Sequence, residues 1–222
     1  MSARDAILGR IRGSLDRGAA TGATRETVDA RLKKRPRGII PARSDRDKNG
    51  QIDLFVEMAS AVEASVVRVE ASEAVPDAVG DYLARHNLGA NVRMAPDHWL
   101  GEIDWALRPT LSITKGPSAG DDEVSVTAAF AGIAETGTLL LHSGPSSPTT
   151  LNFLPENHIV VLRTSQIVGP YEDAWDLLRR AGKMPRAVNM ITGPSRTGDI
   201  EQTIMLGAHG PRRLHIVIVD DD

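Results

Sequence analysis

The segment ITGPSRTGDIE, residues 191–201, carries more polar chemistry than a turn requires. A turn needs one or two glycines or prolines, because glycine permits positive φ and proline fixes φ. This segment adds three hydroxyls, one guanidinium and two carboxylates. Backbone amides beside glycine, together with hydroxyls and a guanidinium, favour binding of a carboxylate or a phosphate. The residues that we expect to bind such a substrate here are Gly193, Pro194, Ser195, Arg196, Thr197 and Glu201.

Asp199 and Glu201 leave two interpretations of this segment open. Their negative charges repel an anion unless both side chains point away from it. Alternatively, Thr197 caps a helix that begins near Gly198, and the two carboxylates stabilise the positive N-terminal end of that helix. We keep Asp199 as a catalytic candidate beside the capping interpretation.

Glu135 and His209 are the other two catalytic candidates. Glu135 lies between two apolar runs in AGIAETGTLLL, residues 131–141, where it is either a partly buried general base or nucleophile, or a residue facing water on a hairpin turn. His209 lies in GAHGP, residues 207–211, and is either an acid or base that titrates near neutrality or an ordinary loop histidine. The neighbouring residues that complete the predicted substrate-binding set are Thr136, Gly137, Thr138 and Gly210.

Phosphate-loop and metal-site motifs are not fulfilled. Residues 132–137 have the glycine spacing of a Walker A loop, but Thr138 stands where a lysine is required. No G-x-G-x-x-G is present, so we expect neither nucleotide hydrolysis nor dinucleotide binding. The histidines in or beside predicted strands lack ligand spacing, and we expect no metal site. These histidines are His142, His158 and His215.

Composition restricts the function classes further. The sequence has no cysteine, which excludes disulfides, thiol nucleophiles and cysteine-ligated iron–sulfur clusters in this chain. It has no apolar run long enough to span a membrane and no apolar block of a secretory signal. We therefore expect a cytoplasmic protein.

Charge is divided unevenly along the chain. Residues 1–48 hold thirteen Lys and Arg against six Asp and Glu, and the rest hold thirteen against twenty-three. No aromatic residue precedes Phe55 to stack on bases, so we do not expect nucleic acid as a partner. The basic arm is either a solvated helix with a linker, or a segment that docks on an acidic partner or on a second copy of the chain.

Apolar β-branched runs that alternate with helical patterns predict an α/β fold. The helical stretches have apolar residues three and four apart, and runs such as IVIV lack polar alternation, which is typical of strands covered on both faces. We expect helices at residues 3–17, 52–62, 73–88 and 170–182, and strands at 65–70, 91–95, 110–114, 123–130, 136–143, 158–164, 187–192 and 213–220.

This order of elements predicts a sandwich with a mostly parallel sheet. Residues 1–48 are then a helical N-terminal extension whose last part, 29–45, is a linker or a loop over the body, and residues 49–222 are the α/β domain. We expect the strands at 123–130 and 136–143 to form a hairpin embedded in the sheet. Ligands bind beyond the carboxyl ends of strands in such sheets, so a strand ending at Ile191 places the ITGPSRTGDIE segment in the default site.

Four motifs together resemble a known family. AETGT at 134–138, PENHIVVL at 155–162, TGPSRTGDIE at 192–201 and GAHGP at 207–211 are similar to motifs of the LUD domain family, lactate utilization protein C type, and the resemblance covers about residues 50–220. It implies a three-layer fold like the NagB/RpiA/CoA-transferase superfamily. It also implies a role in oxidation of L-lactate to pyruvate with two partner proteins, one an iron–sulfur protein with its own LUD domain. Iron–sulfur clusters are then expected on a partner and no cofactor in this chain.

Three functional hypotheses follow. In the first, the chain is a subunit of a complex that oxidises L-lactate, and its pocket binds a small carboxylate through Arg196. In the second, it is a stand-alone isomerase or acyl-transfer enzyme on phosphorylated or CoA substrates, with Glu135 as base or nucleophile. In the third, it is a non-catalytic assembly or regulatory subunit whose basic arm binds an acidic partner.

Overall fold

The computed structural model describes residues 2–16, 21–197 and 205–221. The chain divides into two compact units, Met1–Ile39 and Ile40–Asp222. The domain boundary that we expect at residue 48 stays a prediction. None of the helices in the described part of the chain is long and apolar enough to cross a membrane.

The first unit contains two exposed helices, α1 (Ala3–Ser14) and α2 (Gly22–Lys34). A capping box starts α1, since the Ser2 hydroxyl accepts from the Asp5 amide and the Asp5 carboxylate accepts from the Ser2 amide. Arg35 ends α2 in the left-handed conformation with φ of 45°. Neither helix has a buried residue. The apolar stripe of α1, which includes Ile7 and Ile11, is therefore exposed.

Six parallel strands form the main sheet of the second unit, in the order β1-β12-β7-β4-β2-β3. The two central long strands, β7 and β12, are buried over almost their whole length, as expected for apolar runs covered on both faces. The strands are β1 (Ser65–Val69), β2 (Asn91–Met94), β3 (Ser112–Lys115), β4 (Val124–Ala128), β7 (Asn157–Arg163) and β12 (Arg213–Val219).

A second sheet has four strands in the order β8-β5-β6-β9. Strand β6 pairs antiparallel with both β5 and β9, and β5 pairs parallel with β8. A separate short ribbon pairs β10 with β11. The strands are β5 (Ala131–Ile133), β6 (Thr138–His142), β8 (Ile167–Val168), β9 (Val188–Ile191), β10 (Arg196–Thr197) and β11 (Met205–Leu206).

The hairpin predicted between residues 123–130 and 136–143 is wrong. Strand β4 lies in the main sheet between β2 and β7, whereas β6 pairs with β5 in the second sheet. The chain leaves one sheet for the other within one residue, because the Ala129 amide donates to Val161 O at 3.0 Å and the Phe130 amide donates to Leu140 O at 2.9 Å. One continuous apolar run therefore contributes to two sheets.

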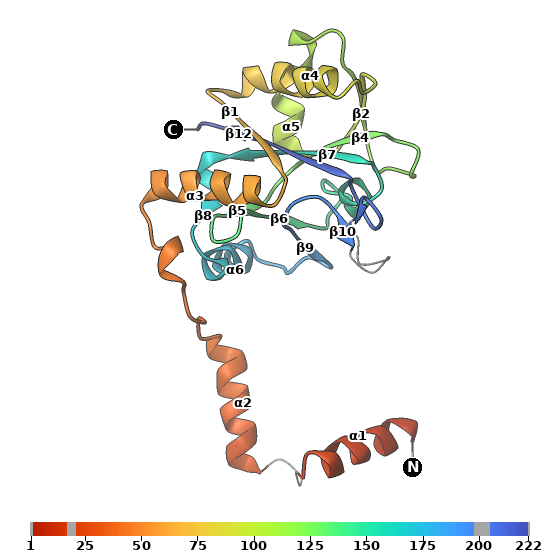
Figure 1. The fold of residues 1–222 in the computed structure, drawn as a ribbon. Helices are drawn as coiled ribbons and strands as arrows, with labels where there is room; N and C mark the ends of the chain where they lie inside the picture. Colours follow the sequence, from red (N-terminus) through yellow and green to blue (C-terminus); the bar gives the residue numbers. More distant parts are fainter. Residues whose placement is uncertain (1, 17–20, 198–204, 222) are drawn as a thin grey trace. The chain divides into compact units, whose positions relative to one another are not determined.

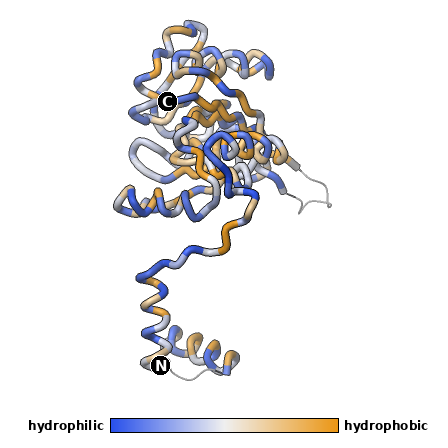
Figure 2. The backbone as a smooth tube through the Cα atoms, turned by 90° about the vertical axis from the view of Figure 1, so that its left-hand side faces the viewer, coloured by the Kyte–Doolittle hydropathy of each residue, from blue (hydrophilic) through white to orange (hydrophobic). Residues whose placement is uncertain are grey.

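The layers of the second unit follow from its three apolar cores (Figure 1). Helices α4 and α5 cover one face of the main sheet, α3 and the second sheet cover the other, and α6 covers the outer face of the second sheet. Hydrophobic segments run through the interior (Figure 2). The helices are α3 (Lys48–Ala61), α4 (Val75–Arg85), α5 (His98–Glu102) and α6 (Tyr171–Arg180), with short 3-10 turns at Ala42–Ser44, Ser72–Ala74, Trp105–Leu107, Thr149–Asn152 and Thr164–Gln166.

The predicted fold class is confirmed: the domain is α/β with a mostly parallel sheet, and helices precede it. Strand β9 ends at Ile191, one residue before the end expected from the sequence, so the segment TGPSRT begins directly after a strand.

Candidate functional site

The loop that follows β9 and the loop that precedes β12 enclose a cavity of about 270 Å³, which we call the loop cavity. The amino ends of β7 and β12 complete its wall through His158 and Leu214. The predicted site residues that line it are Gly193, Pro194, Ser195, Arg196, His209 and Gly210.

Ser195 joins the two loops. Its amide donates to Pro211 O at 2.9 Å, and its carbonyl accepts from the Gly207 amide at 2.9 Å. Its hydroxyl accepts from the His209 amide at 3.3 Å. The two polar segments that the sequence analysis picked out separately, TGPSRT and GAHGP, are therefore one structural unit.

Two buried polar side chains in this wall were not predicted as substrate contacts. Asn152 is 1% exposed and His158 is 0% exposed. Both amide atoms of Asn152, and Nδ1 of His158, are buried without a hydrogen-bond partner among the described residues. Buried polar atoms in folded proteins almost always have partners, so each exception requires an explanation. Asn152 and His158 both line the loop cavity.

The electrostatic state of His158 is set by its surroundings. Burial lowers the pKa of His158 to about 3, so the ring is neutral at physiological pH. Nε2 lies 2.8 Å from the hydroxyl of Thr127, which fixes the ring orientation. Nδ1 is then a hydrogen-bond donor or acceptor, according to the tautomer, in the wall of the cavity.

The mouth of the loop cavity combines charge with apolar surface. Arg196 is exposed and makes no ion pair or hydrogen bond through its guanidinium with another described residue. Phe153 and Met190, which are 43% and 37% exposed, line the same cavity. Among the described residues, the site therefore offers the unpaired guanidinium of Arg196, an apolar rim and a polar floor.

Glu135 does not line the loop cavity. It is half-buried, and its Oε2 accepts from the Tyr171 amide at 3.3 Å, at the first residue of α6. A carboxylate at this position stabilises the positive end of the helix. Arg196 and His209 thus meet in one cavity, and Glu135 lies at the start of a helix.

Thr136 and Thr138 belong to a chain of hydroxyls beside Glu135. The Tyr171 hydroxyl lies 2.8 Å from Thr136 Oγ1 and 2.9 Å from Thr138 Oγ1. Thr138 Oγ1 lies 2.6 Å from Thr192 Oγ1, at the start of the loop after β9. The AETGT turn therefore supports the loop that lines the cavity, and does not itself line it.

Gly137 and Gly193 have a clear structural requirement. Their φ values are 65° and 72°, a region that glycine adopts without strain. A Cβ on Gly137 would overlap the backbone of Ala59, and one on Gly193 would overlap Val62 O, at the end of α3. Both glycines let their loops pack directly on that helix.

Three predicted site residues remain, Thr197, Asp199 and Glu201, and the structure describes only the first of them. Thr197 is nearly buried in β10 and does not line the loop cavity. Asp199 and Glu201 lie outside the described residues, so their catalytic and binding roles stay predictions.

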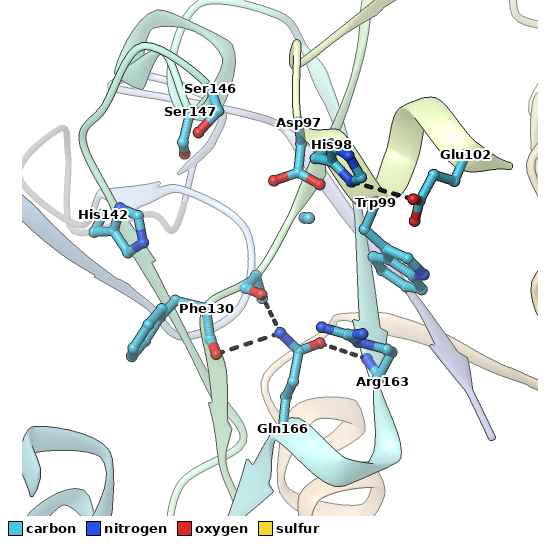
Figure 3. Close-up of a pocket in the computed structure, with 12 residues that line it drawn as sticks. Asp97, His98, Trp99, Glu102, Phe130, His142, Ser146, Ser147, Arg163 and Gln166 are labelled. Carbon is cyan, nitrogen blue, oxygen red and sulfur yellow. Dashed lines mark hydrogen bonds and ion pairs between the residues drawn. The ribbon is translucent and has the colours of Figure 1, made fainter. Parts of the chain in front are cut away.

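A second cavity, of about 380 Å³, lies at the carboxyl ends of β4 and β7, and we call it the sheet-end cavity (Figure 3). None of its residues was singled out from the sequence as a binding residue. The general rule that ligands bind at the carboxyl ends of parallel strands would have pointed to Arg163, the last residue of β7. The charged and polar residues that line it are Asp97, His98, Glu102, His142, Ser146, Ser147, Arg163 and Gln166.

The region that carries both loops is similar to a known domain family. Residues 117–219 match the sequence model of the LUD domain. This region, slightly less than half of the chain, is therefore similar to the LUD domain. All the residues that line the loop cavity fall within the LUD match, whereas α5, which borders the sheet-end cavity, precedes it.

The chain is also similar to two curated proteins and one solved structure. It is 40% identical to "Uncharacterized protein NMB1437" of Neisseria meningitidis over 102 residues, 45% of this chain and 43% of that protein. It is 25% identical to "Lactate utilization protein C" of Shouchella clausii over 190 residues, 80% of this chain and 82% of that protein. The match thus spans less than half of the Neisseria protein and most of the Shouchella protein.

A DUF162 family protein from Deinococcus radiodurans shares the fold. Its crystal structure aligns with a TM-score of 0.57 at 20% identity and covers 78% of this chain and 99% of the Deinococcus chain. This likeness supports the α/β architecture around the LUD region.

Proposed function

We propose that this chain acts in lactate utilization and that its loop cavity binds a small carboxylate such as L-lactate. Relatives named "Lactate utilization protein C" support the role. The buried, unpartnered atoms of Asn152 and His158 in the cavity wall are the observation that carries the binding site.

The chemistry of L-lactate matches the three parts of the cavity. A carboxylate takes a charge-assisted hydrogen bond from Arg196. A hydroxyl both donates and accepts, so it suits the amide of Asn152 and Nδ1 of His158. A methyl group suits the apolar rim formed by Phe153 and Met190. A ligand that satisfies buried polar atoms recovers the free energy lost by leaving them unpaired, about 1–3 kcal/mol for each group.

The electrons are carried elsewhere in this proposal. Oxidation of L-lactate to pyruvate releases two electrons and two protons. The printed sequence holds no cysteine to ligate an iron–sulfur cluster, so partner iron–sulfur proteins accept the electrons while this chain binds the acid. The cytoplasmic location expected from the sequence stays a prediction.

The test is L-lactate-dependent dye reduction by the purified chain, alone and mixed with candidate iron–sulfur partner proteins. We expect activity only in the mixture. Arg196→Ala should raise the KM for L-lactate about tenfold or more, because hydrogen bonds to charged groups contribute about 1.5–3 kcal/mol. Arg180→Ala, at an exposed position of α6, is the matched control and should leave KM unchanged.

Two results would contradict the proposal. Dye reduction by the chain alone would overturn the division of labour with partners. An unchanged KM in Arg196→Ala would overturn the carboxylate contact.

A further inference from the structure

The sheet-end cavity is separate from the loop cavity, since no described residue lines both. Strand β7 runs from one to the other: His158, near its amino end, lines the loop cavity, and Arg163, its last residue, lines the sheet-end cavity. At about 380 Å³ the sheet-end cavity falls in the size range of small-molecule sites.

Arg163 is held in a fixed position on the floor of this cavity. Its guanidinium carbon lies 4.8 Å from the centre of the Trp99 ring, a cation–π arrangement. Its amide donates to Gln166 Oε1 at 2.9 Å. Its Nε lies 4.0 Å from a carboxylate oxygen of Asp221. The backbone and the face of the guanidinium are therefore both constrained.

Gln166 makes this floor rigid. Its Nε2 donates to Ala129 O at 3.0 Å and to Phe130 O at 3.4 Å, at the point where the chain passes from β4 to the second sheet. Figure 3 shows these bonds and the Arg163–Gln166 bond on one side of the open space. The guanidinium thus rests on groups fixed by both sheets.

The amino groups of Arg163 remain available to a ligand. Neither Nη1 nor Nη2 makes a hydrogen bond with any residue in the described part of the chain, and Nε is buried without one. A guanidinium with its edge open and its face stacked on an aromatic ring is suited to bidentate binding of a carboxylate or phosphate. The two amino groups can then donate a pair of hydrogen bonds to one oxyanion.

Acceptors and donors face Arg163 across the cavity. Figure 3 shows Asp97 and His142 on opposite sides of the open space, with Ser146 and Ser147 above it. Asp97 Oδ1 accepts from the Leu100 amide at 3.1 Å, which fixes the carboxylate at the start of α5. Its other oxygen makes no hydrogen bond with a described residue, and a carboxylate oxygen accepts from a hydroxyl.

We propose that the sheet-end cavity binds a small organic anion whose acidic group, a phosphate or a carboxylate, is held by Arg163 and whose hydroxyl donates to Asp97. The acidic group and the hydroxyl lie on the same small molecule because both protein groups line one cavity. Ser146 and Ser147 supply further hydroxyl contacts. This site does not depend on the proposed lactate site.

Calorimetric titration of the full chain tests the proposal with defined probes. Glycerol 3-phosphate and glycerate present a phosphate and a carboxylate beside hydroxyls, and glycerol lacks an acidic group. We expect saturable binding of at least one acid and none of glycerol. Comparison of the two acids identifies which acidic group the site takes.

Variants locate the binding. Arg163→Gln should weaken the binding of whichever acid binds the wild-type chain by about tenfold or more, because the substitution removes a charge-assisted bidentate pair. Arg180→Gln, exposed on α6, should leave the affinity unchanged. Asp97→Ser retains a side chain that caps α5. It should weaken the binding of glycerol 3-phosphate without weakening the binding of inorganic phosphate, which has no carbon-bound hydroxyl.

Absence of saturable binding by either acid would overturn the proposal, as would wild-type affinity in Arg163→Gln. Thermal melting of each variant establishes that it folds. Should Arg163→Gln fail to fold, amide chemical-shift changes in the wild-type chain decide: they must occur at Ala128, Ala129 and Phe130, and their absence there would overturn the proposal. Because the two cavities share no lining residue among those described, failure of the sheet-end proposal would leave the lactate proposal untouched.

Discussion

Asn152 and His158 lie in the wall of the same cavity, and both have buried side-chain atoms without a hydrogen-bond partner among the described residues. The relationship is not a consequence of sequence proximity alone. Asn152 ends the 3-10 turn at Thr149–Asn152, whereas His158 is the second residue of β7. A buried polar pair of this kind reduces the stability of the empty chain and favours a ligand.

Asn152→Leu tests whether the unpaired amide lowers the stability of the empty chain and favours ligand binding. Removing an unpaired buried amide should raise the free energy of unfolding by about 1–3 kcal/mol and weaken L-lactate binding about tenfold. Urea unfolding and calorimetry measure the two effects. Asn157 is the matched control, since it is equally buried but donates to Glu123 O and accepts from Arg213. Asn157→Leu should destabilise the chain, and similar destabilisation by Asn152→Leu would contradict the account.

Stability should fall as the pH falls from about 6.5, the ordinary histidine value, toward about 4. Burial lowers the pKa of His158 to about 3, and burial, assisted by the positive charge of Arg85, lowers that of His215 to about 4. Below the unfolded pKa, the unfolded chain binds protons that the folded chain does not. Each histidine then contributes a slope of up to about 1.4 kcal/mol per pH unit, with stability greater at higher pH.

Urea midpoints measured between pH 4.5 and 7 check this slope. His158→Gln should reduce it by the contribution of one histidine, and the exposed His98 provides the control variant His98→Gln. A slope unaffected by His158→Gln would mean that this ring is not buried in its neutral form.

Gly137→Ala and Gly193→Ala should each destabilise the second unit by about 1–3 kcal/mol or more. An added Cβ would overlap backbone atoms at the end of α3, and alanine is disfavoured at the positive φ of both positions. Thermal or urea unfolding measures the loss. A Cβ on Gly144 meets nothing within 4 Å, so Gly144→Ala should change stability little. Equal effects at all three positions would refute close packing of the two loops on α3.

Glu135→Gln separates a structural from a catalytic carboxylate. Loss of its charge at the start of α6 should cost about 0.3–1 kcal/mol, and affinity for L-lactate should not change because Glu135 lies outside the loop cavity. Unfolding and calorimetry give both values. A large loss of turnover in the reconstituted mixture, with stability and affinity intact, would instead support the general-base role considered from the sequence.

Much of the fold could be predicted from apolar periodicity. The helix at α6 and the strands at β7, β9 and β12 were predicted within a few residues, because their patterns are strong and bounded by proline or glycine. The partner of each strand could not be predicted in the same way. The passage between sheets at Ala129 and Phe130 depends on which carbonyl groups accept their amides, which local pattern does not encode.

The candidate site was predictable in part. Glycine-rich polar loops indicated the segments around Ser195 and His209, which do meet. The loops lie at the amino end of β7, opposite to the edge that the general rule favours for ligands, because β9 belongs to the second sheet. Asn152 carries no local signal at all, and its importance arises only from burial.

Amide chemical-shift mapping with L-lactate tests the central claim most directly. The account predicts saturable changes at Ser195, Arg196, His209 and Gly210, which line the loop cavity. The absence of saturable changes at these four residues would contradict it.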